Sequence, residues 1–166
     1  MKSSMRWKSW VLVCLVSVWV GGVQANSIKT TQYEDWASVC DTSIRPERCE
    51  IRQVLRENAQ TGGAQLLKAS LSKVDDQFLL QLLFPMGIDL RPGIALQIDQ
   101  QQEQRFQFLT CTQAGCLVAI PVDQAMMINL RAGQVVKLGL KPLNAQRPVV
   151  MQMSLRGFNN ASQQVK

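Results

Sequence analysis

Short segments in which apolar and polar residues alternate, separated by turn-forming residues, make up most of this chain after a polar stretch at residues 26–32. Ile94, Leu96 and Ile98, for example, recur at every second position after the turn dipeptide Pro92-Gly93. A period of two indicates strands that bury one face. Because the sequence has no internal repeat and no long helical pattern, it predicts an all-β fold, either a sandwich or a barrel.

The first predicted strand lies around Trp36 and Val39 and ends at Cys40. The segment at 77–84 is apolar on both faces, which indicates the centre of a sheet. Phe106, Phe108 and the residues up to 111 are predicted to form one continuous strand. The other predicted strand segments are 49–55, 64–73, 94–98, 116–120, 135–140 and 149–155.

One short helix interrupts the strands. Asp123 is a favourable N-cap for a helix that runs through Leu130, with Gly133 as its C-terminal stop. Met126 and Met127 in this helix are interpreted as a core plug, with an adaptable binding surface as the alternative. Residues 159–166 are predicted to form a frayed polar tail.

The first 25 residues match an export signal. Lys2, Arg6 and Lys8 precede an apolar run at 10–20, and residues 23–25 (Val-Gln-Ala) fit a small-residue cleavage site. As a retained anchor, this run would cover only about half of the ~30 Å hydrocarbon core at ~1.5 Å per residue. A lipoprotein is disfavoured because Cys14 lies inside the apolar run. We therefore expect residues 1–25 to be a cleaved signal peptide and the mature protein to be periplasmic or secreted to the outer cell surface.

The mature chain is predicted to be a single domain at 26–166, because removing 25 residues from 166 leaves 141. All 12 acidic residues but only 18 − 3 = 15 of the basic ones lie in it, so the net charge falls from +6 to +3. The basic residues are scattered among acids, which argues against a nucleic-acid partner. No later segment is long and apolar enough to span a bilayer, so no integral membrane span is expected after signal cleavage.

Four cysteines remain in the mature chain: Cys40, Cys49, Cys111 and Cys116. In an oxidising compartment an even number indicates disulfides, with three possible connectivities. Their spacing favours the local pairs Cys40 with Cys49 and Cys111 with Cys116, the second across a Gly-containing hairpin turn. A zinc site is the alternative, but the gap from Cys40 to Cys49 fits it poorly.

Histidine is absent from the whole sequence. This excludes Ser-His and Cys-His nucleophile pairs, His-ligated metal sites and imidazole proton shuttles. Catalysis by carboxylates alone remains as an alternative. The candidate acids, however, mostly neighbour turn-forming residues and are interpreted as caps or turn residues; they are Asp75, Asp76, Asp89, Asp99 and Asp123.

An arginine row, formed by Arg48, Arg52 and Arg56, is the one charge pattern that stands out. Its parity differs from that of Cys49 and Ile51, so we interpret it as the solvated face of a strand. The same residues also have i, i+4 spacing, which leaves a short basic helix with a binding role as the alternative.

Several segments together resemble the invasion-associated locus B (IalB) family of exported bacterial proteins. The resemblance covers about residues 36–158, and the order and spacing of its parts carry it. These parts are Trp36 with Cys40, Cys49 to Gln53, Phe84 to Ile94, Phe106 to Cys111 with Gly115-Cys116, Leu130 to Gly133, and Ser154 to Phe158.

The resemblance implies an immunoglobulin-like β-sandwich with paired cysteines, found in some pathogens in association with entry into host cells. It supplies no catalytic residues, and we predict no catalytic, cofactor-binding or metal-binding site. The leading hypothesis is an exported, non-enzymatic interaction protein that contacts another envelope protein or a host-cell protein. The alternatives are a periplasmic component of an envelope complex, a carrier with a ligand cavity in the sandwich, and a carboxylate-only hydrolase.

Overall fold

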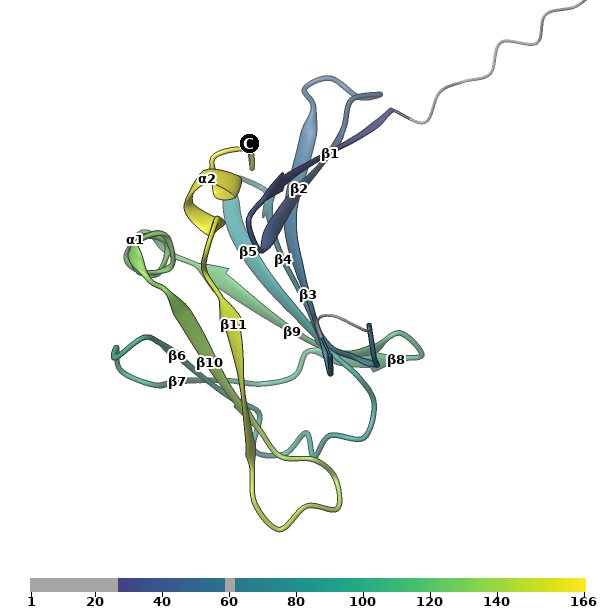
Figure 1. Ribbon diagram of the computed structural model, residues 1–166, viewed down its shortest axis with the longest axis vertical. Coiled ribbons are helices and arrows are strands. Elements are labelled where there is room, and N and C mark those ends of the chain that lie inside the picture. Colours follow the sequence, from purple (N-terminus) through teal and green to yellow (C-terminus); the bar gives the residue numbers. More distant parts are fainter. Residues whose placement is uncertain (1–26, 59–61) are drawn as a thin grey trace, which may run out of the picture.

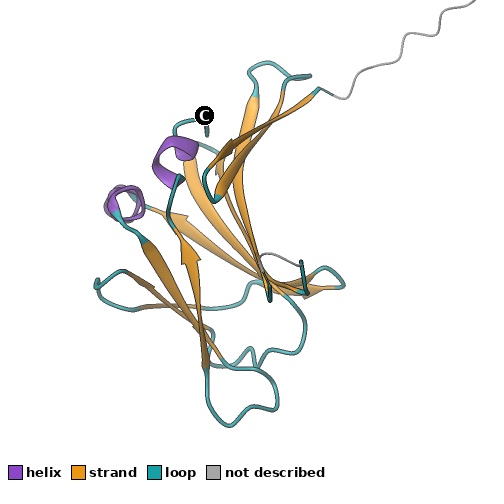
Figure 2. Cartoon of the chain, in the orientation of Figure 1, coloured by secondary structure: helices purple, strands orange, loops and turns teal. Residues whose placement is uncertain are grey.

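The computed structural model describes residues 27–58 and 62–166. The proposed signal peptide lies outside these residues. Strands dominate the described part of the chain, and its two short helices lie close together on one side of the molecule (Figure 2). The prediction of an all-β sandwich is confirmed, because the strands form two antiparallel sheets that face each other (Figure 1).

The large sheet has seven strands in the order β1-β2-β3-β4-β5-β9-β8. Every neighbouring pair in it is antiparallel. The central position predicted for residues 77–84 is confirmed, since β5 lies between β4 and β9. The strands are β1 (Ile28–Tyr33), β2 (Trp36–Asp41), β3 (Arg48–Arg56), β4 (Gln65–Val74), β5 (Gln77–Phe84), β8 (Thr110–Thr112) and β9 (Gly115–Val122).

The small sheet has four strands in the order β11-β10-β6-β7, also antiparallel. Its members are β6 (Ile94–Ile98), β7 (Gln104–Phe106), β10 (Val135–Leu140) and β11 (Val149–Ser154). The edge strand β11 is tied to the large sheet at one end, where Trp36 Nε1 and Gln53 Nε2 both donate to the Ser154 carbonyl at 2.9 and 3.2 Å. These two bonds close the sandwich on that side.

The core is made by rows of apolar side chains that the strand register aligns. Across β3, β4, β5 and β9 the residues Ile51, Leu71, Leu80 and Ile120 stand side by side and are fully buried. In the small sheet, Ile98, Val136 and Met153 form a buried row in the same way. Because side chains alternate along a strand, the residues directly before and after each of these buried positions face outward.

Helix α1 (Gln124–Ala132) follows the large sheet as predicted. The Asp123 carboxylate accepts a hydrogen bond from the Met126 N–H at 2.7 Å and so caps the helix. Met126 and Met127 are buried, which confirms the core-plug interpretation. Gly133 ends the helix, with its N–H bonded to the Asn129 carbonyl.

Most of the polar stretch at residues 26–32 lies in a strand, which its residue pattern did not predict. Ile28–Tyr33 form β1, which pairs with β2 over its whole length. Most of its side chains are exposed, because β1 is an edge strand and lies beyond the reach of the small sheet (Figure 1). An edge strand without a well-buried face lacks the apolar alternation on which the prediction depended.

The prediction of one strand through 106–111 is wrong. Phe106 ends β7 in the small sheet, whereas Thr110 begins β8 in the large sheet. The alternation continues across the break because both phenylalanines pack against the shared core, Phe108 lying edge-on to Phe84 at 6.0 Å between ring centroids. The alternation of apolar and polar residues therefore predicted burial correctly, but it did not predict where one strand ends and the next begins.

The frayed tail and the single helix are also wrong. Residues Phe158–Ser162 form a second helix, α2, which contacts β1, β2 and α1. Phe158, Ala161 and Val165 are buried there. The segment fills the inner side of β2 where the small sheet does not extend (Figure 1). Three apolar residues in a five-residue helix and its end are too few to show a helical period.

Candidate functional site

Both disulfides of the structure join residues that face each other on adjacent strands. Cys40 on β2 is the register partner of Cys49 on β3, and Cys111 on β8 is that of Cys116 on β9. The Cα atoms are 4.0 Å apart in each pair. The two local disulfides of the fold prediction are therefore present, and the second closes the tip of the β8–β9 hairpin.

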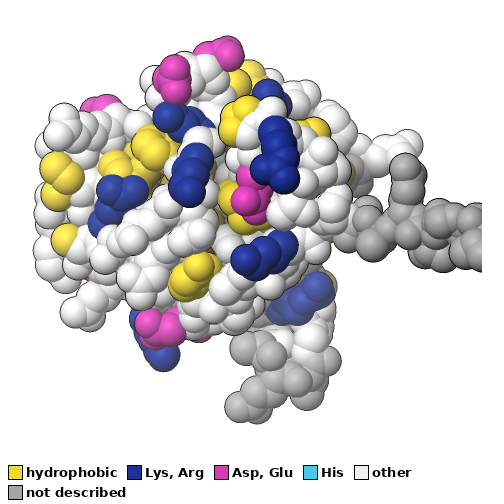
Figure 3. Space-filling model, turned by 90° about the horizontal axis from the view of Figure 1, so that it is seen from above, with side chains coloured by type: hydrophobic (Ala, Val, Ile, Leu, Met, Phe, Trp, Pro, Cys, Tyr) yellow, Lys and Arg dark blue, Asp and Glu magenta, His cyan; other side chains and the backbone are white. Residues whose placement is uncertain are grey.

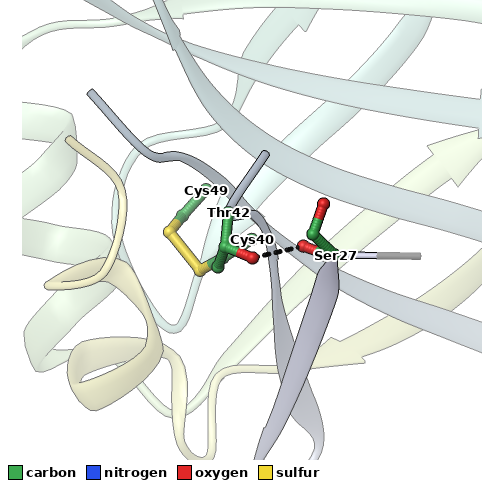
Figure 4. Close-up of a disulfide and its surroundings, with 4 residues drawn as sticks. All are labelled: Ser27, Cys40, Thr42 and Cys49. Carbon is green, nitrogen blue, oxygen red and sulfur yellow. Dashed lines mark hydrogen bonds between the residues drawn. A yellow bond between two sulfur atoms is a disulfide. The ribbon is translucent and has the colours of Figure 1, made fainter. Parts of the chain in front are cut away.

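The Cys40–Cys49 bridge stands beside the start of the described chain. The Ser27 carbonyl accepts a hydrogen bond from the Thr42 hydroxyl at 2.7 Å (Figure 4). It accepts a second from the Thr42 backbone N–H at 2.8 Å. Thr42 lies in the loop that this disulfide closes. The bridge and these bonds together fix the beginning of β1 against the sheet.

The same corner holds the group most like a metal site among the described residues. Ligand atoms of Cys40, Glu47 and Cys49 lie within 4.8 Å of one another. The two sulfurs are joined as a disulfide, however, and zinc is bound by thiolates. The oxidised pair leaves one carboxylate as a ligand, which is too few for the zinc alternative.

Four carboxylates border one open hollow of about 650 Å³ on the outer side of β2, β3 and β4. Asp75 and Asp76 reach it from the β4–β5 turn, where both adopt left-handed backbone conformations typical of tight turns. Asp41 and Glu50 approach from β2 and β3. The hollow also contains basic groups, and Asp76 pairs with Lys73 at 3.0 Å.

Asp89 is the most deeply buried of the predicted acids. Its carboxylate accepts two hydrogen bonds from the Arg91 guanidinium, both at 2.8 Å, and lies 3.7 Å from Lys141 Nζ. The hydrogen bond from the Arg91 side chain lowers the pKa of Asp89 to about 2. Its N–H also donates to the Lys141 carbonyl at 2.8 Å, so Asp89 fastens the loop before β6 to the end of β10.

The other predicted acids serve local structure. Asp99, in the turn after β6, accepts hydrogen bonds from the backbone N–H groups of Gln134 and Val135. Asp123 caps α1. Asp41, which was not among the predicted acids, behaves in the same way: its carboxylate accepts from the Ser43 hydroxyl and N–H, and the hydroxyl bond chiefly lowers its pKa. The interpretation as turn and cap residues therefore fits these positions.

The arginine row lies on a strand, so the basic-helix alternative is wrong. Arg48, Arg52 and Arg56 lie on β3. Arg48 borders the open hollow, and Arg56 Nη1 donates to the Gly63 carbonyl at 3.3 Å. On the face shown in Figure 3, Lys and Arg side chains are separated by apolar and uncharged ones and form no continuous basic patch. That distribution does not resemble a nucleic-acid surface.

A second hollow, which we call the small-sheet groove, crosses the outer face of the four-stranded sheet. Its volume is about 330 Å³. One row of register partners spans it: Val150, Gly139, Ala95 and Arg105, on β11, β10, β6 and β7 respectively. The rest of its lining is Pro92, Gly93, Glu103, Leu140, Lys141 and Pro148.

Sequence reasoning missed this groove, although one signal for it was present. Gly139 stands inside the apolar strand β10. Its backbone has no positive φ, and an added Cβ would meet only the Ala95 Cβ, at 3.3 Å. Glycine weakens a strand and often marks a close approach by another group. A glycine that the backbone does not require was therefore a usable indication of an outward-facing depression.

Comparison with known proteins decides the family. A sequence model described as "Invasion associated locus B (IalB) protein" matches residues 36–166. The chain belongs to the IalB family. An invasion protein B homolog of Brucella abortus (strain 2308) is 31% identical over 146 residues, which cover 86% of this chain and 81% of that protein. Invasion protein B of Bartonella bacilliformis is 28% identical over 137 residues, covering 80% and 72% respectively.

The fold of this IalB family member also matches a solved structure. The crystal structure of invasion associated protein B from Bartonella henselae aligns with a TM-score of 0.71 at 26% sequence identity. The alignment covers 81% of this chain and 92% of that one. Within residues 27–58 and 62–166, neither helix has the length and apolar character that a membrane crossing requires.

Proposed function

We propose that this IalB family member is an exported, non-enzymatic protein of the bacterial envelope that acts by contact with another envelope protein or a host-cell protein. The family and its named relatives are invasion-associated. The signal-like pattern of residues 1–25 supports export. The two disulfides support an oxidising compartment, either the periplasm or the cell surface.

The surroundings of the carboxylates support the non-enzymatic part of the proposal. General acid catalysis near neutral pH needs a carboxyl group whose pKa is raised. Asp41 and Asp89 shift in the opposite direction, because hydrogen bonds from Ser43 and Arg91 stabilise the ionised forms. Asp99 and Asp123 are engaged by backbone N–H groups. These carboxylates stabilise turns and loops, which is the role expected in an interaction module.

One observation favours a second candidate, a carboxylate-only hydrolase. Asp75, Asp76, Asp41 and Glu50 border the same open hollow, and two carboxyl groups that flank one bond are the minimum for glycoside hydrolysis. The hollow is open to solvent and mixed in charge, which suits a structural surface better than a site that must exclude water. Substitution of these acids separates the two candidates.

The proposal is tested by complementation of a strain that lacks the gene, with entry into host cells as the readout. Asp75→Asn and Asp76→Asn should leave entry near the wild-type level, whereas Cys111→Ser should lower it by destabilising the fold. Fractionation of the same cells distinguishes a periplasmic component from a released factor. Loss of entry by a secreted Asp→Asn variant with normal thermal stability would favour the hydrolase.

A further inference from the structure

We propose that the small-sheet groove is the contact surface of this protein, and that its partner is an acidic protein segment with one bulky apolar side chain. The inference rests on the proposed contact function and assigns it a place and a chemistry. Three features of the groove support it: its shape, the composition of its walls and floor, and the distribution of charge around it.

The shape suits one large side chain. Val150 and Arg105 stand at opposite ends of one register row and are separated by three strand spacings, or about 14 Å. Between them lie only Gly139 and Ala95. With large residues at both ends and two small ones between, the outer face of the sheet is hollowed at its middle strands.

The groove is apolar where a side chain would enter and charged at its borders. Val150 is 66% exposed, and together with Pro148 it forms an apolar wall along β11. Covering this exposed apolar side chain with a partner would remove its surface from water, which is favourable. Arg105 and Glu103, paired at 3.2 Å, form the opposite wall, and Lys141 stands at one end.

The charge around the groove determines the chemistry of the partner. Five basic residues line it, adjoin a lining residue in sequence, or share its face of β10; they are Arg91, Arg105, Lys137, Lys141 and Arg147. Only two acids are comparably placed, Asp89 and Glu103. The excess of three equals that of the whole chain after residue 25, which has 15 basic and 12 acidic residues.

In the rest of the chain after residue 25 the charges therefore balance, with ten basic and ten acidic side chains. Both acids near the groove are paired with arginines, Asp89 with Arg91 and Glu103 with Arg105, so the net charge that a partner would meet is positive. Carboxylates beside an inserted apolar side chain would complement it and speed association. A second copy of this chain would present the same positive surface, and a flat membrane would not fill the depression.

The test uses the mature protein and a defined probe, followed by nitrogen-15 NMR. The probe is a nine-residue peptide with phenylalanine at its centre and glutamate at the two positions on either side. We expect saturable shifts at the amides of Gly93, Ala95 and Gly139, and weaker binding at high salt. A peptide with lysine in place of glutamate should not bind.

Ala95→Leu should fill the groove and weaken peptide binding by at least about tenfold at unchanged melting temperature. Gln152→Leu is the matched control, because it adds the same apolar group to the same face of the sheet outside the groove lining, and it should bind like wild type. Shifts that map elsewhere, or no saturation up to about 1 mM peptide, would overturn the proposal. Equal binding of all variants to phosphatidylglycerol vesicles, without peptide binding, would overturn it in favour of a lipid surface.

The same variants separate failure of this inference from failure of the proposed function. If Ala95→Leu cells enter host cells normally while Cys111→Ser cells do not, the contact function stands and the groove is the wrong surface. If Asp75→Asn abolishes entry instead, with the peptide still bound at the groove, the non-enzymatic function itself is wrong.

Discussion

Replacing Phe158 by alanine should destabilise the protein severely, because the C-terminal segment is part of the core. Phe158 is fully buried and its ring packs edge-on against Trp36, with 5.0 Å between centroids and an interplanar angle of 80°. Truncation of a buried phenylalanine typically costs about 3–5 kcal/mol, which includes the cavity that it leaves. About 0.5–1.5 kcal/mol of this is attributable to the aromatic pair itself.

The corresponding change in melting temperature follows from chain length. With an unfolding entropy of about 2.1 cal/mol/K per residue, the 141 residues after residue 25 give about 0.3 kcal/mol/K, so Phe158→Ala should lower the melting temperature by about 10–17 °C. Calorimetry and urea unfolding at pH 7 with intact disulfides measure both quantities. Val150→Ala, at a side chain that is 66% exposed, should change stability by no more than about 0.5 kcal/mol. A loss below about 1 kcal/mol for Phe158→Ala would show that the segment is not docked, and would refute the reasoning.

Further predictions concern the backbone, a carboxylate, the disulfides and the N-terminus. Gly157→Ala should lower the free energy of unfolding, measured in urea, by more than Gly87→Ala does. Both glycines have positive φ, but an added Cβ would lie 1.9 Å from the Tyr33 carbonyl oxygen at Gly157 and in open space at Gly87. The pKa of Asp89 is lowered from 3.8 to about 2, so its stabilising contribution is complete above pH 3.8 and is lost as the pH falls through about 2. In the Asp89→Asn variant the melting temperature should therefore depend less on pH across that window than in the wild type. Replacing Cys111 and Cys116 together by serine should cost about 2 kcal/mol of unfolding free energy on the chain-entropy estimate for this short loop, and an unchanged melting temperature would contradict it. Intact mass of the envelope protein should correspond to a start at Asn26, and a mass that retains residues 1–25 would exclude cleavage.

The sequence was sufficient for most of the sandwich because burial on one face repeats with period two. Ile94, Leu96 and Ile98 face the core as their alternation predicts. The N-cap role of Asp123 was equally accessible, since it depends on local backbone geometry alone. The local cysteine pairs follow from spacing once a hairpin is assumed.

What the sequence did not reveal depends on contacts between distant segments. The strand β1 is recognisable only through its pairing with β2, and α2 only through its packing against Trp36 and its neighbours. The small-sheet groove requires the register of four strands, which brings Ala95 beside Gly139 and Arg105. Single-chain patterns carry no register, so Gly139 could indicate a depression but not the residues that line it, and the four carboxylates around the open hollow could not be placed together in advance.

The central claim is that this protein acts by contact and not by catalysis, and one combined variant tests it most directly. Glu50→Gln, Asp75→Asn and Asp76→Asn together remove three of the four carboxylates around the open hollow and leave Asp41 to cap its turn. Entry into host cells is then measured in the complemented strain, alongside secretion and melting temperature. The account predicts entry at the wild-type level. Loss of entry in a variant that is secreted and folds normally would contradict it and make the hollow an active site.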